Sequence, residues 1–240
     1  QGILLLLPSF QSENAATLAD WEKLAEIRQS QGWQLEIWQV DQIRSKCPQL
    51  NLEQVTAAIY SPQDRQVDPA TLTLALVEAA QRNGVTFQFG VSVDGVKSTP
   101  SAGTNLGICA QIQTTSGPIE VDWLAIAAGL GSTPLTASLA QPIEIKPVLG
   151  QALHLHLENP LGNLDFQPAI TKDDVHIVPL GQGKYWVGAT VEFPTVRGDV
   201  LANPARLHEV MEKAIAFCPA LGEATIIRVW SGLRPRPENR

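Results

Sequence analysis

A hairpin pattern between residues 173 and 192 constrains the fold more than any other feature of the sequence. The stretch "DDVHIVPLGQGKYWVGATVE" holds two apolar runs rich in β-branched and aromatic residues, joined across Gly181 and Gly183. Two such runs flanking a short glycine turn are typical of an antiparallel hairpin. The preceding run "VLGQALHLHL" alternates strongly and predicts another strand. The chain therefore contains a sheet with antiparallel neighbours.

Elsewhere, strand-like runs outnumber helical ones and do not alternate strictly with them. Helical spacing is expected at residues 14–31, 69–82 and 203–217. The apolar run "WLAIAA" lacks alternation, which predicts a strand covered on both faces. The sequence thus predicts an α+β fold, with a mixed, largely antiparallel sheet and flanking helices.

The helix at 69–82 carries its own start and stop signals. Asp68 is a good N-cap and Pro69 suits the first helical turn. Gly84 predicts the end of the helix. We expect Leu72, Leu76 and Ala79 to be buried.

Composition excludes several classes of partner. With 240 residues, 44% hydrophobic and 17% charged, the chain is globular and large enough for one or two domains. A net charge of -7 disfavours nucleic acid and anionic lipid. The run "ILLLL" meets Pro8 at once and is too short to span a membrane. Three cysteines, odd in number and far apart, indicate a reducing compartment, so we expect a cytoplasmic protein.

Four stretches could carry chemistry, and each also has a purely structural interpretation. In "AIAAGLGSTP", small residues before Gly129 let a backbone approach a phosphate or ring closely, or form an ordinary turn. His154 and His156 share a strand face and could bind zinc, but packed or surface histidines are favoured because no third ligand is evident. Asp174 and His176 share the face opposite Val175 and could line a pocket or a solvated edge.

The fourth stretch is "VWSGLRPRP", which holds Arg234 at the end of an apolar run. A guanidinium group can pair with a carboxylate through two parallel hydrogen bonds, although an ordinary surface arginine remains an alternative. The sequence holds no evident catalytic triad, zinc-protease motif or P-loop. If the protein is an enzyme, we expect no catalytic side chain and a reactive group supplied by a cofactor.

Several motifs in collinear order resemble those of the FAD-dependent D-amino acid oxidase family, and most closely its glycine oxidases of thiamine biosynthesis. They are "VDPATLTLALVEAAQRNGVTF", "VDWLAIAAGLGSTPL", "PVLGQALHL", "VHIVPLGQGKYWVGATVE" and "WSGLRPRP". Family members begin with a strand, a GxGxxG turn and a helix that bind FAD, and end with a glycine-rich segment near the flavin. This chain has neither part, so the resemblance implies an internal fragment that by itself is inactive.

The resemblance also implies roles for individual residues. Arg234 would bind the substrate carboxylate, His176 and Asp174 would face the substrate, and Val191 would form the pocket wall. Glycine oxidases commonly have tyrosine where His176 stands, a departure that bears on substrate choice. The cofactor would be FAD, with these residues beside it: Val93, Ala127, Ala128 and Gly129.

The family pattern further implies two domains and one reaction class. Residues 1–60 and 140–231 would form a discontinuous substrate-binding domain, and residues 61–139 part of an FAD-binding domain. The intact enzyme would oxidise a small amino acid to an imine, and oxygen would reoxidise the flavin. There are two alternatives: a flavin dehydrogenase with another electron acceptor, and a non-catalytic interaction module. The oligomeric state stays open, with a homo-oligomer among the options.

Overall fold

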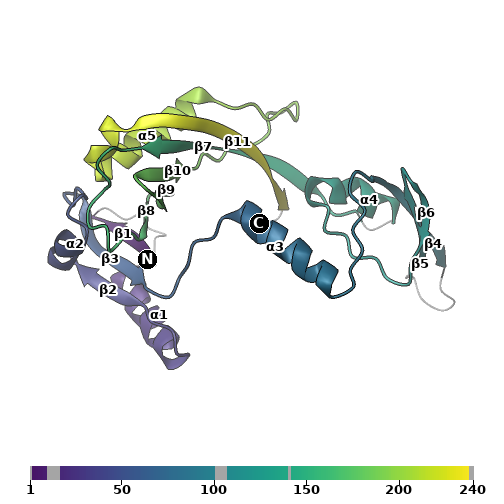
Figure 1. The fold of residues 1–240 in the computed structure, drawn as a ribbon, viewed down its shortest axis with the longest axis horizontal. Helices are drawn as coiled ribbons and strands as arrows, with labels where there is room; N and C mark the ends of the chain where they lie inside the picture. Colours follow the sequence, from purple (N-terminus) through teal and green to yellow (C-terminus); the bar gives the residue numbers. More distant parts are fainter. Residues whose placement is uncertain (1, 10–16, 101–106, 140–141, 238–240) are drawn as a thin grey trace. The chain divides into compact units, whose positions relative to one another are not determined.

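The computed structural model describes residues 2–9, 17–100, 107–139 and 142–237, which fold into two compact units (Figure 1). Unit 1 comprises residues 1–67, 149–192 and 201–232. Unit 2 comprises residues 68–148, 193–200 and 233–240. In the described part of the chain, no helix is both long and apolar enough to cross a membrane.

Unit 1 is built on an eight-stranded sheet in the order β11-β7-β10-β9-β8-β1-β3-β2. Strands β1 and β8 run parallel, whereas β1–β3, β2–β3, β8–β9, β9–β10 and β7–β10 are antiparallel pairs. The predicted mixed, largely antiparallel sheet is therefore confirmed. The strands are β1 (Ile3–Pro8), β2 (Glu36–Gln39), β3 (Val55–Ser61), β7 (Ile145–His156), β8 (Ala169–Lys172), β9 (Val175–Gly181), β10 (Lys184–Gly188) and β11 (Thr225–Pro237).

One face of this sheet, here called the inner face, carries the main core. Helix α5 (Pro204–Phe217) places Val210, Ala214 and Phe217 in the same buried cluster as Leu155 and Val187. Figure 1 shows α5 beside strands β7, β10 and β9. Helix α2 (Val40–Lys46) and the short helix η2 (Pro219–Glu223) add Ile43 and Leu221 to the cluster.

The opposite face, here called the outer face, is covered by a helix at one end. Trp21 of helix α1 (Leu18–Ser30) packs against a small cluster formed by Leu7, Ala57 and Ile59 of β1 and β3. Over strands β8, β9, β10 and β7, no helix among the described residues of unit 1 belongs to a core cluster on this face. Side chains on the outer face of these four strands are therefore available to line a functional site.

Unit 2 contains helices and a small three-stranded antiparallel sheet in the order β4-β5-β6. Its elements are α3 (Pro69–Arg82), β4 (Val93–Pro100), β5 (Gly107–Thr114), β6 (Gly117–Glu120), η1 (Gly129–Gly131) and α4 (Ser132–Ser138). Helix α3 begins as predicted: Asp68 Oδ1 accepts a hydrogen bond of 2.7 Å from the backbone N–H of Thr71. Gly84, with φ +87°, follows its C-terminal cap.

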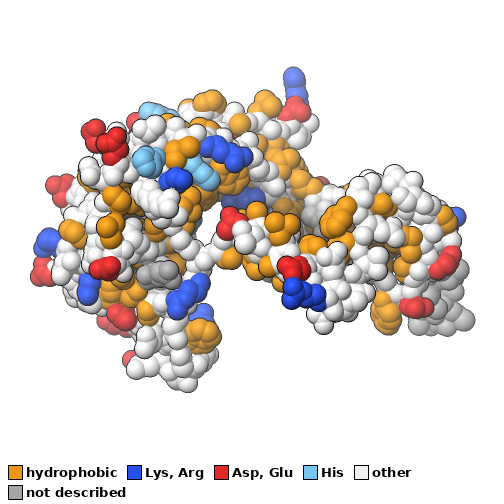
Figure 2. Space-filling model, in the orientation of Figure 1, with side chains coloured by type: hydrophobic (Ala, Val, Ile, Leu, Met, Phe, Trp, Pro, Cys, Tyr) orange, Lys and Arg blue, Asp and Glu red, His pale blue; other side chains and the backbone are white. Residues whose placement is uncertain are grey.

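Two expectations for unit 2 are wrong. Leu72, Leu76 and Ala79 are exposed on α3, and hydrophobic side chains show at the surface there (Figure 2). The run "WLAIAA" forms no strand, and Trp123 is 92% exposed. An apolar pattern predicts that a segment should be covered but does not identify the covering partner. Among the described residues, nothing buries these two segments.

Candidate functional site on the outer face

A two-residue turn brings β8 and β9 together and positions His176. Asp173 and Asp174 join the strands with φ of 49° and 64°. Successive left-handed residues suit the twist of a tight hairpin, and aspartate tolerates this conformation better than most residues. Thr171 of β8 is consequently paired directly with His176 of β9.

Strand alternation then separates the two faces of β9. Val175 and Ile177 are almost completely buried on the inner face, whereas His176 is half-buried on the outer face. Asp174 lies exposed in the turn. Val175, His176 and Ile177 alternate between the two faces as predicted, whereas Asp174 lies in the turn before β9 and not on a strand face. Contact of His176 and Asp174 with a substrate stays a prediction.

His176 is held by a side-chain hydrogen bond. Its Nδ1 lies 2.9 Å from Oγ1 of Thr171. Burial lowers the pKa of His176 below its ordinary value of 6.5, and the nearby Asp174 carboxylate partly opposes this effect. His176 therefore offers the outer face a largely neutral imidazole at neutral pH.

A row of small residues continues across the sheet from His176. Gly188 of β10 is paired with His176 on one side and with Ala152 of β7 on the other. Because directly paired residues share a face, Thr171, His176, Gly188 and Ala152 form one row on the outer face. Thr171 was not among the predicted site residues, because its sequence signal is limited to a position beside a turn.

Val191 follows this row on the segment after β10. Its side chain is 46% exposed, whereas Thr190 and Glu192 on either side of it are buried. The neighbours are fixed to β7: Gln151 N–H donates to Thr190 Oγ1 at 2.8 Å, and Leu149 exchanges two backbone hydrogen bonds with Glu192. Val191 is thereby held outward, as a pocket-wall residue would be.

The carboxylate of Glu192 is the centre of a buried polar network that the sequence analysis missed. Its Oε1 accepts hydrogen bonds from Thr190 Oγ1 at 2.6 Å and Gln151 Nε2 at 2.7 Å, and its Oε2 accepts one from Asn203 N–H at 2.7 Å. Burial raises the pKa of Glu192, but these hydrogen bonds outweigh it and the net pKa is lowered. Asn203 also caps α5, so the network ties that helix to the sheet.

Arg234 lies in unit 2, with an exposed side chain on β11. Its neighbour Pro235 approaches the glycine turn that the sequence analysis assigned to the cofactor: a Cβ built on Gly129 would lie 3.9 Å from Cγ of Pro235. The next arginine, Arg236, stacks over the ring of Phe193 at 5.2 Å. Unit 2 therefore brings the Arg234 segment next to Gly129.

The other predicted cofactor residues also belong to unit 2. Ala127 and Ala128 are exposed, and Gly129 follows them with φ +56°. Val93 begins β4 and is 38% exposed. Small exposed side chains leave the backbone accessible to a large planar ligand, so these residues fit a flavin nucleotide, and their role stays a prediction.

The paired histidines of β7 are half-buried on the outer face, while Leu153 and Leu155 are buried on the inner face. Among the described residues, no three His, Cys, Asp or Glu side chains gather as a metal site would require. The half-buried state of both side chains supports the interpretation that His154 and His156 pack on the sheet.

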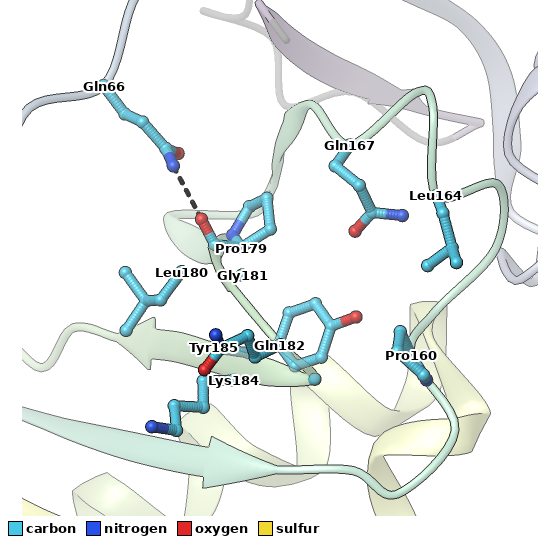
Figure 3. A pocket seen from close by; sticks show the side chains of 11 residues that line it. Gln66, Pro160, Leu164, Gln167, Pro179, Leu180, Gly181, Gln182, Lys184 and Tyr185 are labelled. Carbon is cyan, nitrogen blue, oxygen red and sulfur yellow. Dashed lines mark hydrogen bonds between the residues drawn. The ribbon is translucent and has the colours of Figure 1, made fainter.

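A separate hollow of about 500 Å³ lies at the far end of β9 from His176 (Figure 3). The loop at 160–167 forms one side and the turn at 181–183 the other. Gln66 Nε2 donates to the carbonyl of Pro179 at 2.6 Å, and Tyr185 Oη accepts from Leu161 N–H at 2.7 Å. The hollow contains none of the predicted site residues.

Comparison with known proteins gives consistent matches. The family model described as FAD dependent oxidoreductase matches residues 1–240. A bifunctional protein ThiO/ThiG of Synechocystis sp. is 31% identical over 189 residues, which cover 76% of this chain and 26% of that protein. A glycine oxidase of Geobacillus kaustophilus is 26% identical over 193 residues, which cover 80% and 48%.

Solved structures share the fold. The crystal structure of glycine oxidase from Geobacillus kaustophilus aligns with a TM-score of 0.76 at 23% identity and covers 100% of this chain and 60% of that one. L-proline dehydrogenase from P. horikoshii aligns with a TM-score of 0.80 at 21% identity and covers 97% and 59%. This chain spans less than half the length of those two curated relatives. The chain belongs to the DAO family of FAD-dependent oxidoreductases.

Proposed function

We propose that this chain is part of an oxidase that converts the amine of a small amino acid, such as glycine, sarcosine or a D-amino acid, to an imine. The observation that carries the proposal is the family match over residues 1–240, combined with the imidazole of His176 on the outer face of the sheet. In this proposal residues of unit 1, together with Arg234, bind the substrate, and the rest of unit 2 is part of the FAD-binding domain. We expect the remainder of that domain to bury the exposed leucines of α3.

The side chains have complementary tasks. The Arg234 guanidinium binds the substrate carboxylate through two parallel hydrogen bonds, which fixes the position of the α-carbon. His176 supplies one polar contact from the outer face, with Asp174 beside it in the turn. Val191 contributes an apolar wall, as its outward orientation allows.

The cofactor supplies the chemistry, and the protein supplies binding and orientation. When bound, FAD would supply the oxidising chemistry, as the acceptor of the hydride from the α-carbon of the neutral amino acid, with oxygen as the final electron acceptor. Ala127, Ala128 and Gly129 would lie against the flavin, and Val93 would approach the adenine end through its backbone. Because this reaction needs no protein nucleophile, the lack of an evident catalytic triad in the sequence is compatible with it.

The test is to express the protein from its complete coding sequence and to measure flavin absorbance and glycine-dependent peroxide. Arg234→Ala should retain the flavin and lower kcat/KM by about 100-fold, because the substrate is no longer positioned. Arg228→Ala, an exposed arginine on the same strand, is the matched control. A yellow, folded protein that is inert toward glycine, sarcosine and D-amino acids would refute the proposed substrates.

A dehydrogenase that uses another electron acceptor is the second candidate. Its support is the alignment with L-proline dehydrogenase at a TM-score of 0.80. Oxygen reactivity depends on access to the flavin, which the described residues do not determine. Anaerobic turnover with an artificial acceptor, together with slow turnover in air, would favour the dehydrogenase over the oxidase.

A further inference from the structure

Beside His176, the outer face of the sheet carries two small residues, Gly188 and Ala152, and no large side chain projects from these two positions. Gly188 lies directly opposite His176, and Ala152 lies beyond it on β7. A glycine and an alanine project at most a methyl group from the sheet. Even so, Ala152 is 0% exposed and Gly188 is buried, so another group covers them.

The group that covers Gly188 is the indole of Trp186. A Cβ built on Gly188 would lie 2.9 Å from both Cη2 and Cζ2 of Trp186, so the ring lies directly over the glycine backbone. The same Cβ would lie 2.8 Å from Cβ of Ala152. The indole thus fills the space above Gly188, the residue paired with His176.

Side chains of neighbouring strands also hold the indole in place. Trp186 is paired with Val178 of β9 and His154 of β7, both on the outer face. Trp230 of β11 packs against it with ring centroids 6.5 Å apart. Because Trp186 is half-buried among these groups, moving the ring aside would break several contacts.

We propose that Trp186 is a specificity-determining residue that restricts the substrate beside His176 to amino acids with a hydrogen or a very small substituent on the α-carbon. The inference rests on the proposed function, because it needs the substrate to bind next to His176. A larger side chain would have to occupy the volume that the indole fills above Gly188. Glycine and sarcosine require none of that volume.

The experiment compares kcat/KM for glycine with kcat/KM for D-norvaline in the flavin-loaded, full-length protein. Trp186→Val should change the ratio by about tenfold or more in favour of D-norvaline, since pocket space for a few methylenes is worth that much discrimination. Trp186→Phe should give a smaller change in the same direction. Trp33→Val, which removes a tryptophan that is 53% exposed and follows helix α1, should keep the wild-type ratio.

The outcomes separate this inference from the proposed function. If the wild-type protein oxidises glycine but both Trp186 variants keep its ratio, the inference is wrong and the proposed function stands. If the wild-type protein oxidises no amino acid with any acceptor, the proposed function and the inference both fail. Should Trp186→Val not fold, the ratio measured for Trp186→Phe decides.

Discussion

Thr171 Oγ1 and His176 Nδ1 lie 2.9 Å apart, and neither side chain makes another hydrogen bond within the described residues. The Thr171 hydroxyl can donate its proton to Nδ1 of His176 or accept a proton from Nδ1–H, and the two arrangements belong to the two neutral tautomers of the imidazole. A hydroxyl that donates to Nδ1 fixes the neutral imidazole as the tautomer that carries its hydrogen on Nε2. His176 would then present an N–H donor, suited to a carboxylate oxygen.

The first prediction concerns this tautomer. Thr171→Val should remove the preference, so that the ¹⁵N chemical shifts of His176 show a mixture of the two neutral forms. Thr171→Ser retains the hydroxyl and should keep the Nε2–H form. The shifts can be read at neutral pH in the full-length protein labelled at histidine. A Thr171→Val protein with the wild-type shifts would show that threonine does not set the tautomer.

The second prediction concerns pH. Burial lowers the pKa of His176 below 6.5 in the folded state, against the opposing effect of Asp174. Between that folded pKa and 6.5, the unfolded chain binds a proton that the folded protein does not. The free energy of unfolding should therefore fall as the pH drops through 6.5 and level off below the folded pKa.

Urea unfolding over a pH series measures this dependence. His176→Gln should flatten the fall, because the group that takes up the proton is gone. His208→Gln removes a histidine from the exposed side of α5 and controls for the loss of an imidazole in general. A slope in His176→Gln as steep as that of the wild type would contradict the assignment.

The third prediction concerns the buried network around Glu192. Glu192→Gln would replace one accepting oxygen by an amide that faces existing donors, namely those of Thr190, Gln151 and Asn203. Loss of charge-assisted hydrogen bonds to a buried carboxylate should lower the free energy of unfolding by about 1–3 kcal/mol. Urea unfolding measures the loss. Glu158→Gln, the same substitution at an exposed position just after β7, should change little.

Local pattern was sufficient to predict much of unit 1 and the start of helix α3 in unit 2. The hairpin at 173–192, the alternation around His176 and the cap at Asp68 all follow from rules that act over a few residues. Such features depend on backbone geometry and on which face is apolar, and both can be read from neighbouring positions.

Contacts over long sequence separations were not predictable in the same way. The network of Gln151 and Glu192 joins residues 41 positions apart, and the packing of Trp186 with Trp230 joins β10 to β11. The exposed state of Leu72 and Trp123 was missed for a related reason. An apolar pattern predicts that a segment is buried, whereas tertiary structure determines which other segment covers it.

The fourth prediction concerns the thiols of Cys47 and Cys218, which are free and buried in the main core. Burial raises the pKa of Cys47 to about 11 and that of Cys218 to about 12. Because the thiolate is the nucleophile, iodoacetamide at about pH 8 should label neither residue in the folded protein. Both should react after denaturation, as peptide mapping by mass spectrometry would show. Rapid labelling of either residue in the native protein would contradict its buried position.

The fifth prediction compares two glycines of the β9–β10 turn. Gly181 and Gly183 have φ of 87° and 70°, a conformation that costs a residue with a Cβ roughly 1–2 kcal/mol. A Cβ on Gly181 meets nothing within 4 Å, whereas a Cβ on Gly183 collides with the backbone carbonyl of Leu157. Gly181→Ala should therefore lose only the strain energy. Gly183→Ala should lose clearly more, because the turn must also move away from β7 and weaken the hydrogen bond of 2.8 Å from Leu157 N–H to the Gly183 carbonyl. Equal losses for the two variants in urea unfolding would mean that the carbonyl of Leu157 does not limit the space at position 183.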